Sequence, residues 1–139
     1  MSANEIVASL PFNQHVGLAP RPDGTLQLPD DPRLLNHVGT RHAGALFALG
    51  EAASGVALFD TLGDRLAGMM PVVRTARIDF LKPARGVLVG RGSLDAEVAL
   101  ARFAADGKAD LDVLVDVIDE AGVVVAKLVV TWALRRPRG

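Results

Sequence analysis

One short segment of the sequence holds most of the residue types that could do chemistry. Residues 36–51 read NHVGTRHAGALFALGE, and the small residues Ala43 and Gly44 stand where a helix is expected to begin. Because these residues have almost no side chain, the backbone N–H groups of the first helical turn stay open to a ligand. Those N–H groups and the helix dipole stabilise an oxyanion. We therefore predict an anion-stabilising helix start, with Thr40 as the N-cap.

Glu51 is the only charged residue of the apolar run at residues 43–59. Burial raises the pKa of a carboxyl group that nothing compensates, and such groups are common at catalytic sites. Gly44, Glu51 and Gly55 share one helix face at about 100° per residue. Glu51 nevertheless lies ~10 Å along the axis from Gly44, too far for both to act on one carbonyl group. If they act together, they come from the two helices of a two-fold dimer.

The apolar run must lie inside the fold. At ~1.5 Å per residue, residues 43–59 make a helix ~26 Å long, and a helix that is apolar on all sides must be covered on all sides. A membrane span needs ~20 apolar residues, so this shorter run with a carboxylate at its centre does not fit one. The rest of the chain must therefore supply the cover.

Segments rich in Val and Leu, separated by turn residues, predict the strands that cover this helix. Four strands are expected after it, at residues 72–81, 86–103, 111–118 and 123–134. The breaks between them, at residues 82–86, 106–107 and 119–122, are short enough for antiparallel hairpins. Before the long helix we expect a short helix at 4–10 and short strands at 14–18 and 25–28. The predicted fold class is α+β, an antiparallel meander with the helix against one sheet face.

Length, charge and cysteine content exclude several classes of protein. The 139 residues fit one domain, residues 1–139, and 15 Lys and Arg against 16 Asp and Glu give a net charge of −1. That balance offers no attraction to nucleic acid or to an anionic membrane. The chain has no cysteine, and its three histidines lack metal-binding spacing, so we expect neither a disulfide nor a metal site. The first residues carry no basic signal-peptide region, so we expect a cytoplasmic protein.

The spacing of three polar residues resembles that of a known family. His42 follows Asn36 by six residues, and Glu51 follows His42 by nine. This pattern resembles the hotdog-fold acyl-CoA thioesterases, in particular the branch of the phenylacetate-pathway thioesterase, where an Asn or Gln precedes a His-Gly-Gly helix start and an Asp or Glu follows. The order of elements and the turn sequence IDFLKPARG at residues 78–86 extend the likeness over nearly the whole chain.

The resemblance implies a fold, an activity and a set of site residues. The fold would be a hotdog, a long buried central helix wrapped by an antiparallel sheet of five to six strands. The activity would be hydrolysis of an acyl-CoA thioester to free acid and CoA, in a homodimer that can pair into a dimer of dimers, with no cofactor apart from the CoA of the substrate. The candidate catalytic residues are Glu51, Asn36, Ala43, Gly44 and His42.

The resemblance also implies a role for each candidate. The Ala43 N–H would polarise the thioester carbonyl, and Asn36 would help to place substrate or water. Glu51 of the partner subunit would act as general base or nucleophile, and His42 would mainly shape the helix start. Two positions depart from the family pattern. Ala43 replaces a glycine, which adds a methyl group to the pocket, and Gly55 stands where some relatives place a hydroxyl group.

Each candidate also has a purely structural interpretation. Glu51 could cap a loop or pair with an arginine at a dimer interface. His42 could be an ordinary histidine at a helix start, and Asn36 could brace its loop through hydrogen bonds to the backbone. The basic residues Arg74, Arg77, Lys82 and Arg85 and the tail at 135–138 could bind CoA phosphates or simply be solvated. Candidates for the acyl pocket or the core are Phe12, Phe47, Phe59 and Phe80.

Two other functions remain open at this stage. The first is a non-catalytic hotdog module that binds acyl-CoA or an acyl group. The second is a hydratase or dehydratase, which would need a carboxylate and a histidine acting together. His42 and Glu51 lie ~180° apart around one helix, so that helix alone cannot form such a pair.

Overall fold

The computed structural model describes residues 1–138. In chain order its elements are α1 (Ala3–Ala8), α2 (Pro11–Val16), β1 (Ala19–Pro20), β2 (Leu26–Leu28), the 3-10 helix η1 (Pro32–Leu34), α3 (Ala43–Leu62), the 3-10 helix η2 (Gly63–Gly68), β3 (Met70–Phe80), β4 (Leu88–Ser93), α4 (Glu97–Asp106), β5 (Lys108–Ile118) and β6 (Val124–Arg135). The long helix, the leading helix and four strands after the long helix are confirmed.

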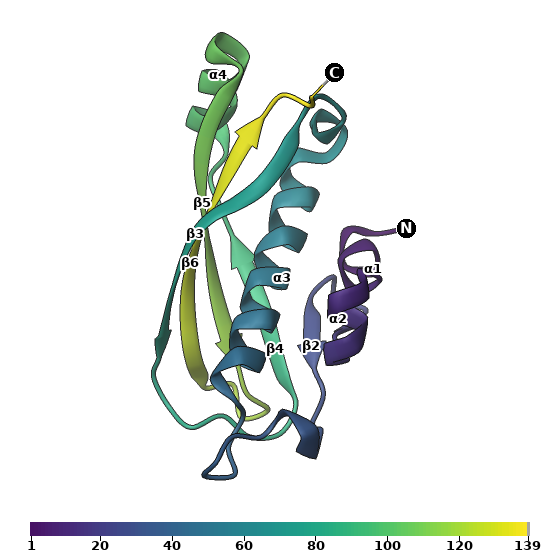
Figure 1. The fold of residues 1–139 in the computed structure, drawn as a ribbon, viewed down its shortest axis with the longest axis vertical. Helices are drawn as coiled ribbons and strands as arrows, with labels where there is room; N and C mark the ends of the chain where they lie inside the picture. Colours follow the sequence, from purple (N-terminus) through teal and green to yellow (C-terminus); the bar gives the residue numbers. More distant parts are fainter. Residues whose placement is uncertain (139) are drawn as a thin grey trace.

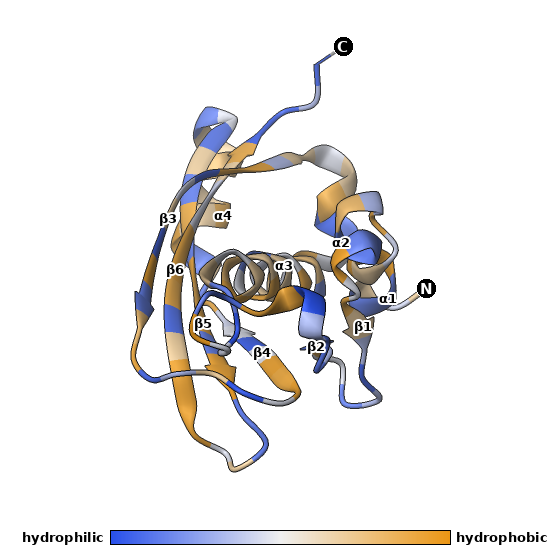
Figure 2. Cartoon of the chain, turned by 60° about the horizontal axis from the view of Figure 1, so that its bottom comes forward, coloured by the Kyte–Doolittle hydropathy of each residue, from blue (hydrophilic) through white to orange (hydrophobic). Residues whose placement is uncertain are grey.

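Six strands form one antiparallel sheet in the order β1-β2-β4-β5-β6-β3. The sheet curves around α3, and α1 and α2 lie beside β1 and β2 (Figures 1 and 2). This is the predicted α+β hotdog arrangement, with a central helix wrapped by an antiparallel sheet. The long axis of α3 runs along the sheet, so its N-terminus lies at one end of the molecule (Figure 1).

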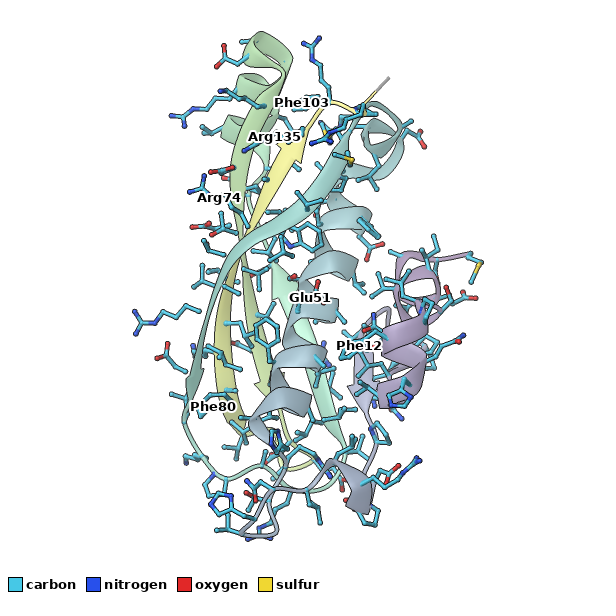
Figure 3. All side chains as sticks on the ribbon, in the orientation of Figure 1. Phe12, Glu51, Arg74, Phe80, Phe103 and Arg135 are labelled. Atoms are coloured by element: carbon cyan, nitrogen blue, oxygen red, sulfur yellow. The ribbon has the colours of Figure 1, made fainter. Side chains whose placement is uncertain are left out.

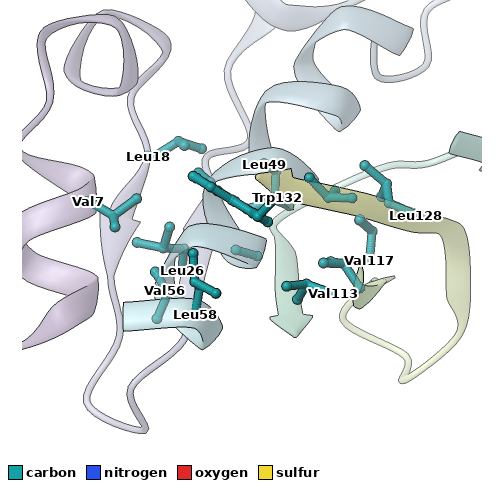
Figure 4. Close-up of a cluster of buried hydrophobic side chains, with 14 of the residues drawn as sticks. Val7, Leu18, Leu26, Leu49, Val56, Leu58, Val113, Val117, Leu128 and Trp132 are labelled. Carbon is teal, nitrogen blue, oxygen red and sulfur yellow. The ribbon is translucent and has the colours of Figure 1, made fainter. Parts of the chain in front are cut away.

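Small residues let α3 lie close to the sheet. A Cβ added at Gly90 would lie 2.8 Å from the Ala53 Cβ, and one at Gly92 would lie 2.7 Å from the Ala57 Cβ. These β4 positions therefore need glycine because the helix passes directly over them. Leucines and valines of the helix and the strands fill the remaining core (Figure 4).

The apolar character of α3 is explained by this burial. By length and composition, the stretch Ala43–Gly68 could cross a membrane, with a hydropathy of 1.4 in its most apolar window. However, 67% of that window is buried inside the fold. Such burial is what the core helix of a folded domain shows.

One buried polar contact ties α3 to the sheet. The Ser54 side chain is fully buried, and its Oγ donates to the Glu51 carbonyl oxygen at 2.6 Å. Ser54 Oγ also accepts a hydrogen bond from Trp132 Nε1 at 3.0 Å. Ser54 thus supplies the acceptor for the N–H of the buried Trp132 ring, so the role of Ser54 is structural.

Ser54→Ala is expected to lower the free energy of unfolding by about 1–3 kcal/mol, because it leaves the buried Trp132 N–H without an acceptor. Urea denaturation followed by far-UV circular dichroism measures this. Trp132→Phe provides the second arm of a double-mutant cycle. The two changes should be less than additive, since Ser54→Ala cannot break a bond that is already absent. Full additivity would contradict the assigned contact.

The expected strand at 14–18 is wrong. Pro11–Val16 forms α2, which ends at Gly17 with a φ of 92°, and the strand β1 begins only at Ala19. Proline at the first turn of a helix and glycine in the left-handed conformation after its end are both helix-boundary features. They outweigh the short apolar pattern around Val16.

The expected strand at 86–103 is also wrong in its second half. β4 ends at Ser93, and Glu97–Asp106 forms α4, so the break at 106–107 is a helix end rather than a hairpin. Asp95 Oδ1 accepts from the Glu97 N–H at 3.1 Å at the start of α4, and Gly107 (φ 74°) ends it. The sequence EVALARFAAD is rich in good helix formers.

The strands after α3 do not follow one another as a simple meander. β3 pairs with β6, and β4 pairs with β2 and β5, so the segment between β3 and β4 is a crossing connection and not a hairpin. The β5–β6 hairpin lies between the two strands. Turn residues alone do not distinguish a hairpin from such a connection. The crossing connection passes the N-terminal end of α3, which brings it to the candidate site (Figure 1).

Candidate active site

The N-terminus of α3 is capped by His42 and not by Thr40. His42 has an extended backbone (φ −63°, ψ 140°), and its Nδ1 accepts a hydrogen bond from the Gly44 N–H at 2.8 Å. Thr40 is buried two residues earlier, and its Oγ1 accepts from Asn36 Nδ2 at 2.8 Å. The Thr40 hydroxyl is therefore engaged in the loop, and an imidazole takes the capping role.

One backbone N–H at this helix start remains free. The N–H groups of Ala45 and Leu46 donate to the His42 carbonyl oxygen at 3.0 and 3.1 Å, and the Gly44 N–H donates to the His42 ring. Within residues 1–138, the Ala43 N–H has no such partner. Ala43 is also an exposed residue at the first position of α3.

A cavity of about 350 Å³ opens at this N–H. Its walls are the loop at 36–41, the first turn of α3, the end of β3 and the crossing connection at 81–84. Ala43, Asn36 and Phe80 are among the lining residues. The cavity thus brings Asn36 and Ala43 together, as the resemblance implies.

Asn36 braces the loop on which it lies. Its Oδ1 accepts from the N–H groups of Val38 and Thr40, both at 3.0 Å, and its Nδ2 also lies 3.5 Å from the Arg41 carbonyl oxygen. The structural interpretation of Asn36 therefore holds in this structure. Because Asn36 also lines the cavity, its side chain holds one wall of the site in shape.

Arg41 is a site residue that the sequence analysis missed. Its side chain is fully buried, and its Nη2 donates to the Gly86 carbonyl oxygen and, at 3.1 Å, to Asp30 Oδ1. Its Nη1 donates to the Asp31 carbonyl oxygen at 3.3 Å, and its own N–H donates to the Ala84 carbonyl oxygen at 2.9 Å. Arg41 therefore fastens the loop before α3 to the crossing connection.

Arg41→Met is expected to lower the free energy of unfolding by about 3 kcal/mol, because hydrogen bonds from a charged group contribute about 1.5–3 kcal/mol each and two backbone carbonyl oxygens lose theirs. Chemical denaturation measures the loss. Asp30→Asn is the matched control and should cost under about 1 kcal/mol, since the Asp30 side chain is 66% exposed. Equal effects of the two changes would contradict the role given to the backbone contacts.

Glu51 lies midway along α3 and is half-buried (Figure 3). Burial raises the pKa of its carboxyl group. Among residues 1–138, no side chain or backbone group forms a hydrogen bond or an ion pair with that carboxylate. Within the described chain, Glu51 therefore neither caps a loop nor pairs with an arginine.

A single chain does not bring Glu51 to the free N–H. α3 is one continuous helix, so Glu51 lies about 12 Å along its axis from Ala43. Between them Phe47 is 39% exposed, on the same side as Gly44 and Glu51, whereas Leu58 further along that side is fully buried. The N-terminal half of this helix face is therefore open, and the C-terminal half is covered.

No metal-binding group stands out in the described chain. Residues 1–138 contain no cluster of three or more His, Cys, Asp or Glu side chains that could hold a metal ion.

Comparison with known proteins places the chain in a family. Residues 17–134 match the DUF4442 family, which is described as a domain of unknown function. The chain belongs to that family. A comparison with curated proteins gives no match.

Several solved structures share the fold of this chain. PA5026 from Pseudomonas aeruginosa, described as a protein of unknown function and probable thioesterase, is 31% identical with a TM-score of 0.83, over 97% of this chain and 94% of that one. Rv1847/MT1895 from Mycobacterium tuberculosis, described as a candidate esterase, is 26% identical with a TM-score of 0.75, over 94% and 100%. BH2602 from Bacillus halodurans, solved with CoA, is 24% identical with a TM-score of 0.66, over 89% and 76%.

These matches confirm the hotdog-fold thioesterase superfamily that the resemblance at Asn36, His42 and Glu51 implied. Thioesterase is the activity named in the description of PA5026, the 31%-identical relative, as a probable one.

Proposed function

We propose that this DUF4442 protein hydrolyses an acyl-CoA thioester to the free acid and CoA, as a homodimer. The observation that carries the proposal is the free Ala43 N–H at the mouth of a cavity, on a helix whose open face bears a half-buried carboxylate. A hydrogen-bond donor for an oxyanion and a carboxyl group of raised pKa are what thioester hydrolysis needs. The relative of the same fold that was solved with CoA supports the substrate class.

In the proposed reaction, the thioester carbonyl oxygen accepts the Ala43 hydrogen bond. Glu51 of the partner subunit takes a proton from water as the water oxygen attacks the carbonyl carbon. The tetrahedral oxyanion collapses, the C–S bond breaks, and the CoA thiolate takes the proton back from the carboxyl group. In the nucleophilic variant, the carboxylate attacks directly, the thiolate leaves, and water hydrolyses the resulting anhydride. Both routes give acid and thiol.

The dimer in this proposal forms at the outer edge of β3. β3 pairs with β6 on one side, and its other edge is unpaired within residues 1–138. Val72 and Phe80 of this strand are 45% and 51% exposed. Two β3 strands that pair antiparallel about a two-fold axis would set the start of one α3 beside the middle of the other. Each site would then combine Ala43 of one subunit with Glu51 of the partner subunit.

Lys82 is the basic residue best placed for the CoA phosphates in this proposal. It is exposed and lines the cavity that opens at Ala43. The ion pair between Arg74 and Asp110, at 2.9 Å, and that between Arg77 and Asp79, at 3.2 Å, already engage the two arginines of β3. A free ammonium group is better able to meet a phosphate than a paired guanidinium.

Thiol release from a panel of acyl-CoA thioesters tests the proposal. The panel holds short, medium, long and aryl-acetyl thioesters, with wild type beside Glu51→Ala. Turnover that disappears in the folded variant would support hydrolysis with Glu51 in the reaction. Binding of acyl-CoA without thiol release would favour the non-catalytic module instead. Addition of water to an enoyl-CoA would favour a hydratase.

A further inference from the structure

A second cavity lies on the other side of the α3 start. It has a volume of about 300 Å³ and is walled by α2, the end of η1 and the first turn of α3. Its lining includes Phe12, Val16, Leu34, Leu35 and Ala45, all of them apolar. Figure 3 places Phe12 on α2, at the level of the N-terminal half of α3.

The walls of this cavity expose more apolar surface than a covered core would. Phe12 is 65% exposed and Leu35 is 40% exposed. Exposed apolar groups gathered around a hollow commonly mark a ligand-binding site. The polar side chains in the lining are Arg33, whose guanidinium is paired with Asp31 at 2.7 Å, and His42, whose Nδ1 accepts from the Gly44 N–H. The cavity therefore offers little to a charged ligand and much to a hydrocarbon.

Two consecutive residues at the start of α3 line different cavities. Ala43 lines the first cavity, and Gly44 lines the second. A thioester whose carbonyl oxygen met the Ala43 N–H could therefore extend one arm toward each cavity. The first cavity carries the polar side chains of Asn36, Thr40 and Lys82, which suit the amide groups and phosphates of the CoA arm. The apolar cavity is left for the acyl arm.

We propose that the cavity between α2 and the α3 start binds the acyl group of the substrate, and that this group is an aliphatic chain of medium length. The inference rests on the proposed thioester hydrolysis. The volume of about 300 Å³ stands at the small end of ligand pockets, which span roughly 300–1,000 Å³, and so suits a chain of medium length better than a long one. The aliphatic walls of Val16, Leu34 and Leu35 favour each additional methylene that they remove from water.

Leu35→Trp tests this site by filling it. The Leu35 backbone bridges to Arg41, and this bridge does not depend on the side chain, so the loop should keep its path. The ratio of kcat/KM for octanoyl-CoA to that for acetyl-CoA is expected to fall tenfold or more. Leu10→Trp is the matched control, because Leu10 precedes α2, is 48% exposed and does not line the cavity. In Leu10→Trp the ratio of kcat/KM for octanoyl-CoA to that for acetyl-CoA should change less than twofold.

Phe12→Ala provides a second variant that carries little risk to folding, since the side chain is mostly exposed. It is expected to raise the KM for octanoyl-CoA several-fold and to leave the KM for acetyl-CoA unchanged. Circular dichroism confirms that each variant is folded.

Calorimetric binding of S-octyl-CoA and S-ethyl-CoA, thioethers that cannot be hydrolysed, separates this proposal from the proposed reaction. Tighter binding of S-octyl-CoA that Leu35→Trp abolishes would support the acyl site even if no thioester is hydrolysed. Equal binding of the two thioethers by wild type would overturn the acyl site even if hydrolysis occurs. An equal loss of octanoyl-CoA and acetyl-CoA turnover in Leu35→Trp would overturn it as well.

Discussion

Replacing Ala43 with proline is expected to lower kcat by about 10²–10³-fold, the usual effect of removing one oxyanion donor. Proline has no N–H, so the variant loses the N–H at the start of α3 that has no partner within residues 1–138. The helix itself should survive, because proline is well tolerated at the first helical position. The extended backbone of His42 (φ −63°, ψ 140°) is also the conformation that a residue before proline prefers.

Two controls accompany this variant. Ala43→Gly keeps the N–H and removes a methyl group from the cavity, so it should keep full activity. Ala43→Val keeps the N–H and adds bulk to the cavity, so it separates crowding from loss of the donor. Steady-state thiol release supplies kcat and KM for each. If the proline and valine variants lose activity equally, crowding and not the lost hydrogen bond is responsible.

Glu51→Gln is expected to lower kcat by about 10²–10⁴-fold, the range of general acid–base catalysis, while the protein stays folded. The amide is close in size to the carboxyl group but cannot accept the proton of an attacking water. Because no hydrogen bond or ion pair within residues 1–138 depends on the carboxylate, the change should not destabilise the chain. Retention of more than a tenth of the activity would rule out Glu51 as base or nucleophile.

The pH dependence of activity and that of stability should run in opposite directions at Glu51. Burial raises the pKa of this carboxyl group above its ordinary value of 4.5, so the ionised form that catalysis needs accumulates only as pH rises through the raised pKa. Stability changes the other way. The folded state binds more protons than the unfolded state between the two pKa values, so the free energy of unfolding falls as pH rises through that window.

Measurements of kcat/KM and of the free energy of unfolding between about pH 4 and pH 8 check both pH dependences. This pH range includes both an ordinary and a raised carboxyl pKa. Glu51→Gln should lose the stability slope that belongs to this group. An unchanged stability profile in the variant would mean that the Glu51 carboxyl group titrates as it does in the unfolded chain.

The parts of the fold that the sequence predicts well are those with one dominant physical cause. Residues 43–59 are apolar on every side, which allows little except a covered helix, and the helix start follows from the small residues at 43 and 44. The long strands β5 and β6 carry the repeated Val and Leu of a sheet that packs on a helix. The resemblance carried by Asn36, His42 and Glu51 then identifies the superfamily.

The parts that the sequence does not predict depend on contacts between distant segments. Arg41 resembles any surface arginine until the fold brings residues 84–86 to it, because its partners there are backbone carbonyl groups. The cap at His42 is unexpected since serine, threonine and aspartate are the usual cap residues. The α4 helix is hidden because a short apolar run fits a strand and a helix equally well.

The open edge of β3 has a consequence for handling the protein. An isolated chain presents a long row of unpaired backbone groups together with Val72 and Val73, 45% and 36% exposed, and such an edge is a template for aggregation. If a second copy covers this edge, the apparent free energy of unfolding rises with protein concentration. Association consumes folded monomer and so shifts the folding equilibrium toward the folded state. Dilution would then lower the apparent stability, and substitutions in β3 that weaken this contact would expose the edge and reduce the yield of soluble protein before they altered the fold.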